Sequence, residues 1–322
     1  MMAAVLLIPL AVLVSSVVLV WLLSGPLAGL ATDHPNHRSL HARPIPRTGG
    51  IGIMLAVLAG WWLGGLPVPA PLYWGTLVLM LVSFADDRLD LPAAIRFAVH
   101  LLVAGWLTWR LGFMGVSFVL AVLATGWMTN LYNFMDGADG LAGGMAWWGF
   151  GSYALAFWQA GEGGLALAAA CVALAAAGFL LFNFPPARVF MGDAGSVPLG
   201  FLAAGFGLVG MHDDVWAVWF PALVFAPFIV DATVTLSRRI LRREKIWQAH
   251  REHYYQRLIR MGWSHRKMML VAWASMLASG VVAVILLQSE RFFWLGGIWF
   301  AVFAGQLWWT DRCWQRFQMA QK

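Results

Sequence analysis

The chain has 322 residues, of which 61% are hydrophobic and only 11% are charged, and its formal net charge is +6. Soluble domains are about half apolar and about a quarter charged, so this composition excludes an ordinary soluble protein and predicts an all-α protein that spans a membrane. The positive charge does not indicate a nucleic-acid partner, because the Lys and Arg residues are spread over loops that border the predicted membrane segments.

Long apolar runs predict a polytopic bundle of about 11 transmembrane helices, which forms one integral-membrane domain over residues 1–322. No Lys or Arg precedes the first run, which is also longer than the apolar region of a signal peptide, so we interpret it as an uncleaved span. The predicted helices cover residues 4–23, 50–66, 70–85, 93–109, 113–133, 141–159, 164–182, 196–211, 214–236, 267–287 and 292–310.

Basic residues predict the orientation of this bundle. If successive helices alternate in direction, 19 of the 21 Lys and Arg residues fall on one side, and the exceptions are Arg110 and Arg291. The positive-inside rule makes that side cytosolic. It places the N-terminus outside and the C-terminus in the cytosol. The predicted cytosolic loops, which we expect to form the functional site, are 24–49, 86–92, 134–140, 183–195 and 237–266.

The first of these loops ends in a basic segment. Arg43, Arg47 and Thr48 precede Gly49 and Gly50 at the predicted start of a helix. Basic side chains and free N–H groups at a helix start suit a diphosphate. The alternative is a loop that contacts only lipid head groups.

Asp86 and Asp87 follow the third apolar run. Two adjacent carboxylates beside an apolar helix are costly unless a cation or a basic partner compensates them. Carboxylate oxygens are ligands that Mg²⁺ prefers. The alternative is that Asp87 forms an ion pair with Arg88 or Arg96.

Amides and carboxylates recur at the end of the fifth apolar run. At about 100° per residue, Asn130, Asn133 and Asp136 share one face of a helix. Asp139 follows, and glycines on either side of it break the helix and let the backbone approach a ligand. This pattern predicts a polar pocket at the membrane border, while helix capping by Asn and Asp is the alternative.

The loop that follows the seventh run contains Arg188, Phe190, Asp193 and Ser196. Glycines beside Asp193 predict a tight turn that projects its carboxylate, and Ser196 is a predicted N-cap of the next helix. Phe190 has the right chemistry to stack on a base. The alternative is an ordinary Gly-Asp turn with a buried Phe.

The longest loop contains His250, Arg251 and His253. The histidine spacing could indicate a Zn²⁺ site, but no third ligand with a suitable spacing is apparent, so we predict that these side chains bind a phosphate. An amphipathic helix on anionic lipid is compatible with the same sequence. Asp231 lies inside a predicted span, where a carboxylate is either functional or a paired structural group.

Together, in this order, the five motifs resemble the polyprenyl-phosphate N-acetylhexosamine-1-phosphate transferase family over roughly residues 30–270. The resemblance implies that UDP-N-acetylhexosamine and undecaprenyl phosphate are the substrates, that UMP is released, and that Mg²⁺, with Mn²⁺ as a possible substitute, is the cofactor. It also allows for a homodimer. The proposed route is attack by a lipid-phosphate oxygen on the β-phosphorus of the donor. A covalent aspartyl-phosphate route is the alternative.

The resemblance also implies residue roles. Asp86, Asp87 and Asp136 match catalytic carboxylates, while Asp193 and Asn133 match Mg²⁺ ligands. Among the predicted substrate-binding residues, Asp139 would contact the uracil edge and Phe190 would stack on uracil. The predicted substrate-binding residues are Asp139, Asn130, Phe190, Arg43, Arg47, Thr48, Arg188, His250, Arg251 and His253.

Two segments favour one branch of this family. The segment that carries Arg43 and Arg47, and the His-Arg-Glu-His order at His250, look closer to the enzymes that initiate O-antigen synthesis than to the phospho-MurNAc-pentapeptide transferases. Donors with GlcNAc or with a 6-deoxy sugar such as FucNAc or QuiNAc stay open. The alternatives are the peptidoglycan enzyme and, in a different class, a membrane transporter or lipid flippase.

Overall fold

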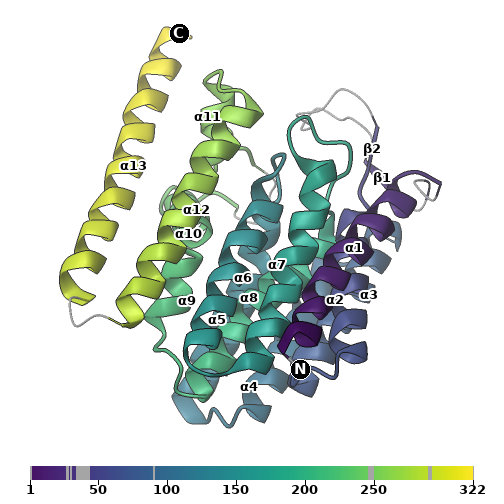
Figure 1. Ribbon diagram of the computed structural model, residues 1–322. Helices are drawn as coiled ribbons and strands as arrows, with labels where there is room; N and C mark the ends of the chain where they lie inside the picture. The colour runs from purple at the N-terminus through teal and green to yellow at the C-terminus, as the bar shows by residue number, and fades with distance from the viewer. Residues whose placement is uncertain are drawn as a thin grey trace.

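The computed structural model describes residues 2–26, 29, 31–33, 44–89, 91–245, 250–288 and 292–321. The described chain is helical apart from loops and one short antiparallel strand pair, β1 (Thr32–Asp33) with β2 (Ile45–Pro46). The helices are α1 (Met2–Ser24), α2 (Gly49–Leu63), α3 (Ala70–Leu89), α4 (Ala93–Arg110), α5 (Gly115–Phe134), α6 (Leu141–Gln159), α7 (Gly163–Asn183), α8 (Asp193–His212), α9 (Trp219–Val224), α10 (Ala226–Leu241), α11 (Tyr254–Arg260), α12 (His265–Leu287) and α13 (Phe292–Ala320) (Figure 1).

Each predicted apolar run overlaps a helix of the structure. The reason is that a backbone in hydrocarbon has to satisfy its hydrogen bonds within the segment. Among the described residues, five helices are long and apolar enough to cross a membrane, namely α1, α5, α7, α8 and α12. The chain is therefore a polytopic helical membrane protein, while the number of spans and the orientation stay predictions.

Helix α8 lies at the centre of the bundle and positions the candidate site. It is buried along almost its whole length and packs against α5, α3 and α2. Gly200 lies on the backbone of α5, and Gly195 lies against Gly50 of α2, where a Cβ on either residue would overlap the other. These close approaches require glycine. Asp193, the first residue of α8, is consequently held in the middle of one end of the bundle.

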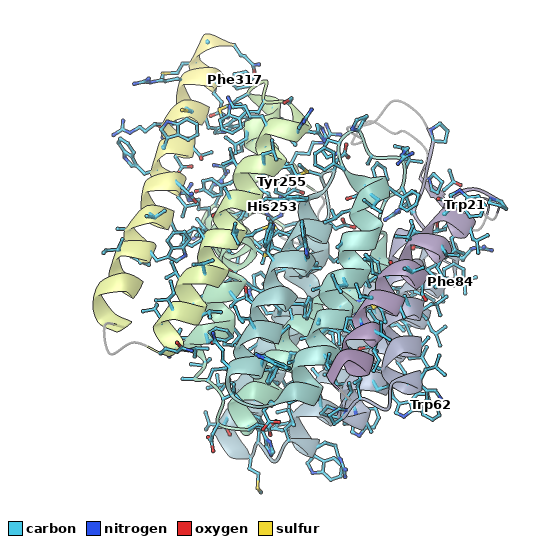
Figure 2. All side chains as sticks on the ribbon, in the orientation of Figure 1. Trp21, Trp62, Phe84, His253, Tyr255 and Phe317 are labelled. Carbon is cyan, nitrogen blue, oxygen red and sulfur yellow. The ribbon has the colours of Figure 1, made fainter. Side chains whose placement is uncertain are left out.

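Successive long helices alternate in direction, so the start of α1 and the end of α13 lie at opposite ends of the bundle (Figure 1). We call the end at which α1, α3, α5 and α7 stop the motif end; it is the upper end in Figure 1. Exposed tryptophans mark both ends, with Trp21 near the motif end and Trp62 near the other (Figure 2). Aromatic residues at two levels are typical of the two interfaces of a membrane.

Three segments differ from the sequence prediction. The predicted helix at 214–236 is divided into α9 and α10 at Phe225, where Pro227 occupies the first turn of α10 and contributes no backbone N–H. Helix α13 continues to Ala320, well past its predicted end. Helix α11 forms inside the segment that the sequence predicts as a loop.

Candidate active site

Polar side chains from four segments meet at the motif end. Arg47 precedes α2, Asp87 lies in the last turn of α3, and Asp193 begins α8. The Arg47 Nη2 atom lies 3.3 Å from Asp193 Oδ1, and Arg47 Nη1 lies 3.9 Å from Asp87 Oδ1. Asn133, in the last turn of α5, donates from Nδ2 to Asp193 Oδ2 at 3.3 Å. One cation and two carboxylates therefore share a cluster, with an amide bound to one of the carboxylates.

Ser196 supports this cluster from inside α8. The sequence predicts it as an N-cap, which is wrong, because α8 begins at Asp193 and Gly192 is its N-cap. The Ser196 hydroxyl donates to Asn133 Oδ1 at 2.9 Å, so it orients the amide of Asn133 toward Asp193.

Asp136 lies beside the cluster, just after the end of α5. Its side chain is only partly accessible, and burial raises the pKa of Asp136 well above its usual range. The positive charge of Arg47 opposes that rise, the charge of Asp193 adds to it, and a hydrogen bond from the Gly192 backbone opposes it. Asp136 therefore lies at the edge of the cluster, next to the residue that precedes Asp193.

Asp86 has a different environment from its neighbour Asp87. Asp86 Oδ2 accepts a hydrogen bond from Arg96 Nη1 at 2.6 Å, and Oδ1 accepts one from the Leu91 backbone at 2.8 Å. The side chain of Asp86 is 8% exposed. The ion pair that the sequence allows between Asp87 and Arg96 is therefore made by Asp86, which fastens the turn between α3 and α4.

The turn after α5 is tied to the loop after α7. Asp139 Oδ2 accepts a hydrogen bond from the Ala187 backbone at 3.0 Å. Asn183 Oδ1 accepts one from the Gly140 backbone, and Asn183 Nδ2 donates to the Val189 carbonyl, both at 2.8 Å. The sequence analysis missed Asn183; its signal is a polar amide that ends an apolar run. In this structure Asp139 is bound to the protein backbone rather than open to a base.

The first loop docks on the loop that contains Phe190. The backbone N–H of Phe190 donates to Pro46, while the N–H groups of Gly49 and Gly50 donate to the carbonyls of Phe190 and Met191. The start of α2 therefore cannot offer these two N–H groups to a phosphate, which corrects that expectation. The phenyl ring of Phe190 is partly exposed.

Thr48 does not face the cluster. Its side chain is fully buried, and its hydroxyl donates to the Leu23 carbonyl at 3.1 Å. In this structure Thr48 therefore makes a structural contact with α1, and its substrate contact stays a prediction. Arg43, predicted with it, lies outside the described residues.

Two further predicted residues are held by local contacts. Asn130 Nδ2 donates to the Gly126 carbonyl at 2.7 Å, and the side chain of Asn130 also interacts with His100, a buried residue of α4 that the sequence analysis missed. Arg188 is exposed, but its guanidinium donates to the Leu181 carbonyl and lies over the ring of Phe182. Neither contact joins these two side chains directly to Asp193.

Asp231 anchors the histidine segment. Its carboxylate accepts hydrogen bonds from the backbone of Tyr254 at 2.9 Å and of Tyr255 at 3.1 Å, and His253 Nδ1 lies 3.1 Å away. His253 is 3% exposed and precedes α11, and its ring stacks beside that of Tyr255 (Figure 2). Asp231 therefore caps α11. His253 is a buried group paired with Asp231, and its substrate contact stays a prediction.

His250 and Arg251 stay partly exposed. Burial lowers the pKa of His250 to about 4, with further contributions from the positive charges of His253 and Arg239. His250 Nδ1 accepts the Glu252 backbone N–H at 3.4 Å, so a neutral His250 keeps its other ring nitrogen as the donor. A neutral imidazole can donate to a phosphate but adds no charge.

The residues present fit a Mg²⁺ ion. Among the described residues, no three His, Cys, Asp or Glu side chains form a metal site by themselves, but Mg²⁺ is usually bound by one or two carboxylates with waters and substrate phosphates. Arg47 between Asp87 and Asp193 shows that this space accepts positive charge. Reversing the Asn133 amide would aim its oxygen at the ion, and the Ser196 hydroxyl could then accept from the nitrogen.

Comparison with known proteins identifies the family. Residues 70–211 match the family described as glycosyl transferase family 4. A decaprenyl-phosphate N-acetylglucosaminephosphotransferase of Mycolicibacterium smegmatis is 31% identical in a match that covers 79% of this chain and 75% of that protein. A probable undecaprenyl-phosphate N-acetylglucosaminyl 1-phosphate transferase of Bacillus subtilis is 29% identical in a match that covers 85% of this chain and 80% of that protein. The chain therefore belongs to the polyprenyl-phosphate N-acetylhexosamine-1-phosphate transferases and is a sugar-phosphate transferase.

Proposed function

We propose that this enzyme transfers N-acetylhexosamine-1-phosphate from a UDP-sugar to undecaprenyl phosphate and requires Mg²⁺. The observation that carries the proposal is the cluster of Asp87, Asn133 and Asp193 around Arg47. A diphosphate donor needs this combination, because phosphoryl transfer depends on positioning and on neutralising charge at the phosphates. The names of the relatives support a polyprenyl-phosphate acceptor.

The reaction forms one P–O bond and breaks another. An oxygen of the lipid phosphate attacks the β-phosphorus of the donor, and the bond between that phosphorus and the bridging oxygen breaks. UMP leaves with the electron pair. A bound Mg²⁺, held by Asp193 and Asn133, would neutralise charge on the diphosphate, and Arg47 would neutralise more.

The two members of the aspartate pair have different roles in this proposal. Asp86 is engaged by Arg96 and by the Leu91 backbone, so it acts by fixing the α3–α4 turn. Asp87 faces Arg47, which supports a role for Asp87 in orienting the lipid phosphate. Its help as a base would be small, since the second pKa of a phosphate monoester is about 6.

The donor's nucleotide would lie between the turn after α5 and the loop after α7. Asp136 and Asp139 lie on one of these segments, and Phe190 lies on the other. The partly exposed ring of Phe190 offers a stacking surface for uracil. Binding a uracil edge through Asp139 would require its bond to Ala187 to be exchanged or shared.

The substrates locate the site at a membrane border, because the donor is water-soluble and the acceptor is embedded in lipid. The sequence predicts 19 of the 21 basic residues on one side of the membrane, and the described Arg47, Arg96 and Arg188 of that set lie at the motif end. We therefore assign that end to the cytosol, with the N-terminus in the periplasm of a bacterial inner membrane. About 11 spans accommodate the chain. A homodimer is compatible with this arrangement.

GlcNAc is the sugar that the proposal favours, because the relatives from Bacillus subtilis and Mycolicibacterium smegmatis are named for N-acetylglucosamine. FucNAc and QuiNAc are the alternatives. The product would be the first lipid-linked intermediate of an O-antigen or another cell-envelope polysaccharide.

A panel of UDP-sugars tests the proposal. Purified protein is incubated with undecaprenyl phosphate, Mg²⁺ and one donor at a time, including UDP-MurNAc-pentapeptide, and UMP and the lipid product are measured by mass spectrometry. We expect equal amounts of UMP and lipid product with UDP-GlcNAc and none without Mg²⁺. Turnover with the pentapeptide donor alone would identify the peptidoglycan reaction instead. Ion-coupled uptake without UMP would favour a transporter.

A further inference from the structure

One face of α12 packs against the turn between α5 and α6. The side chains of His265, Met269 and Trp273 are spaced four residues apart and therefore share this face. His265 Nδ1 lies 3.7 Å from Asp139 Oδ2. The Met269 side chain fills the space where a Cβ of Gly140 would lie. The stripe thus covers the turn that carries Asp139.

Trp273 connects this face of α12 to the turn through a hydrogen bond. Its Nε1–H donates to the Gly140 carbonyl at 2.9 Å, across 133 positions of sequence. The opposite side of the same residue is also held, because the Gly140 N–H donates to Asn183 Oδ1 at 2.8 Å. Gly140 has a φ of +71°, a conformation that glycine adopts at little cost. The Gly140 carbonyl also accepts the Gly144 N–H at 3.1 Å at the start of α6, and the two side-chain bonds tie both polar groups of this position to distant elements.

The indole of Trp273 has a site shaped for it. It lies over Gly144, where a Cβ would overlap Nε1. Its ring also meets Trp147 and Phe184 edge to face, with centroids 5.6 Å and 6.2 Å away. Phe184 is the first residue of the loop that leads to Phe190 and Asp193. One side chain of α12 thus touches both segments that we assign to the donor.

We propose that Trp273 is a positioning residue of the transferase, whose indole N–H holds the Gly140 turn so that Asp136 and Asp139 face the donor. The inference rests on the proposed function. It extends the site to α12, which the sequence motifs do not include. Trp273 acts through the backbone and does not itself contact the substrate.

The test compares two Trp→Phe variants. Trp273→Phe keeps an aromatic ring but removes the N–H. Trp148→Phe is the matched control, because Trp148 stacks on Trp147 and its buried Nε1 has no hydrogen-bond partner within the described part of the chain. A second variant, Gly144→Ala, displaces the indole while leaving Trp273 intact. We measure kcat, the KM for the donor, the Mg²⁺ concentration for half-maximal activity, and the thermal unfolding midpoint.

We expect Trp273→Phe to lower kcat about five-fold, the size typical of one lost hydrogen bond, and to raise the required Mg²⁺ concentration. Gly144→Ala should give the same pattern, and Trp148→Phe should match the wild type. The unfolding midpoint of Trp273→Phe should lie slightly below that of Trp148→Phe, because only Trp273 loses a formed hydrogen bond. Equal kcat and Mg²⁺ requirement in all variants would overturn the inference, as would a defect confined to stability. A wild type that releases no UMP would instead contradict the proposed function.

Discussion

Replacement of Asp231 by Ala should release α11 from the bundle. In the structure this carboxylate accepts two backbone hydrogen bonds at 2.9 and 3.1 Å and lies 3.1 Å from His253. Hydrogen bonds to a charged group contribute about 1.5–3 kcal/mol each, and removal of an N-cap costs about 0.5–2 kcal/mol. Because these contributions overlap, we take a loss of about 3 kcal/mol, which raises the opening equilibrium constant of α11 roughly a hundredfold.

Limited trypsin digestion of the detergent-solubilised protein reports this opening. Arg257 is 5% exposed and is bound to Asp311 and to the Glu252 carbonyl, so cleavage after it requires α11 to detach. The cleavage rate follows the open population when opening and closing are fast. We expect roughly hundredfold faster cleavage in Asp231→Ala and an intermediate rate in Asp231→Asn, which keeps one neutral acceptor.

Thr235→Val is the control for this experiment. The Thr235 hydroxyl makes only a long hydrogen bond of 3.3 Å to Asp231 Oδ1, and Val has nearly the same volume. We expect its cleavage rate to change by less than about threefold. An unchanged rate in Asp231→Ala would refute the assignment of Asp231 as the anchor of α11 and would return it to the candidates for a functional carboxylate.

Three further predictions address individual side chains. Asp87→Asn should lower kcat at least about tenfold more than Asp86→Asn, because Asp87 faces Arg47 while Asp86 fastens a turn; equal losses in steady-state UMP release would contradict this division. Thr48→Val should lower the unfolding free energy by about 1 kcal/mol and leave the donor KM unchanged, because its hydroxyl meets only the Leu23 carbonyl; a raised KM would show a substrate contact. Burial and neighbouring positive charge hold the pKa of His250 at about 4, below the unfolded value of about 6.5, so the unfolded chain binds more protons between these pH values and stability falls as the pH falls from about 6.5 to 4. Thermal unfolding should show that His250→Gln loses less stability than the wild type between about pH 6.5 and pH 4. Identical pH profiles of stability in the two proteins would contradict the lowered pKa of His250.

The helices could be predicted because a long apolar run in lipid has to satisfy its backbone hydrogen bonds within the segment, and an α-helix does so. The division between α9 and α10 could have been found from Pro227, which removes a backbone donor inside an apolar run. Helix α11 was harder to predict, because its start is fixed by Asp231, which lies more than twenty positions earlier. Local propensity carries no sign of such a partner.

The sequence predicts which types of side chain form the candidate site better than it predicts which of them contact one another. Carboxylates and amides at the ends of apolar runs indicate Asp87, Asn133 and Asp193, because unpaired polar groups are costly there. The sequence could not separate Arg47, which faces the cluster, from the adjacent Thr48, which is buried against α1. That difference arises from how the first loop packs and not from residue type.

The central claim is that Asp193 and Asn133 hold one divalent ion together with the donor's diphosphate. Titration of Mn²⁺ into the purified enzyme in the presence of UDP, followed by electron paramagnetic resonance, tests it directly. The account predicts one bound Mn²⁺ per chain in the wild type and an affinity at least about tenfold weaker in Asp193→Asn. An Asp193→Asn enzyme that binds Mn²⁺ as tightly as the wild type would contradict the account.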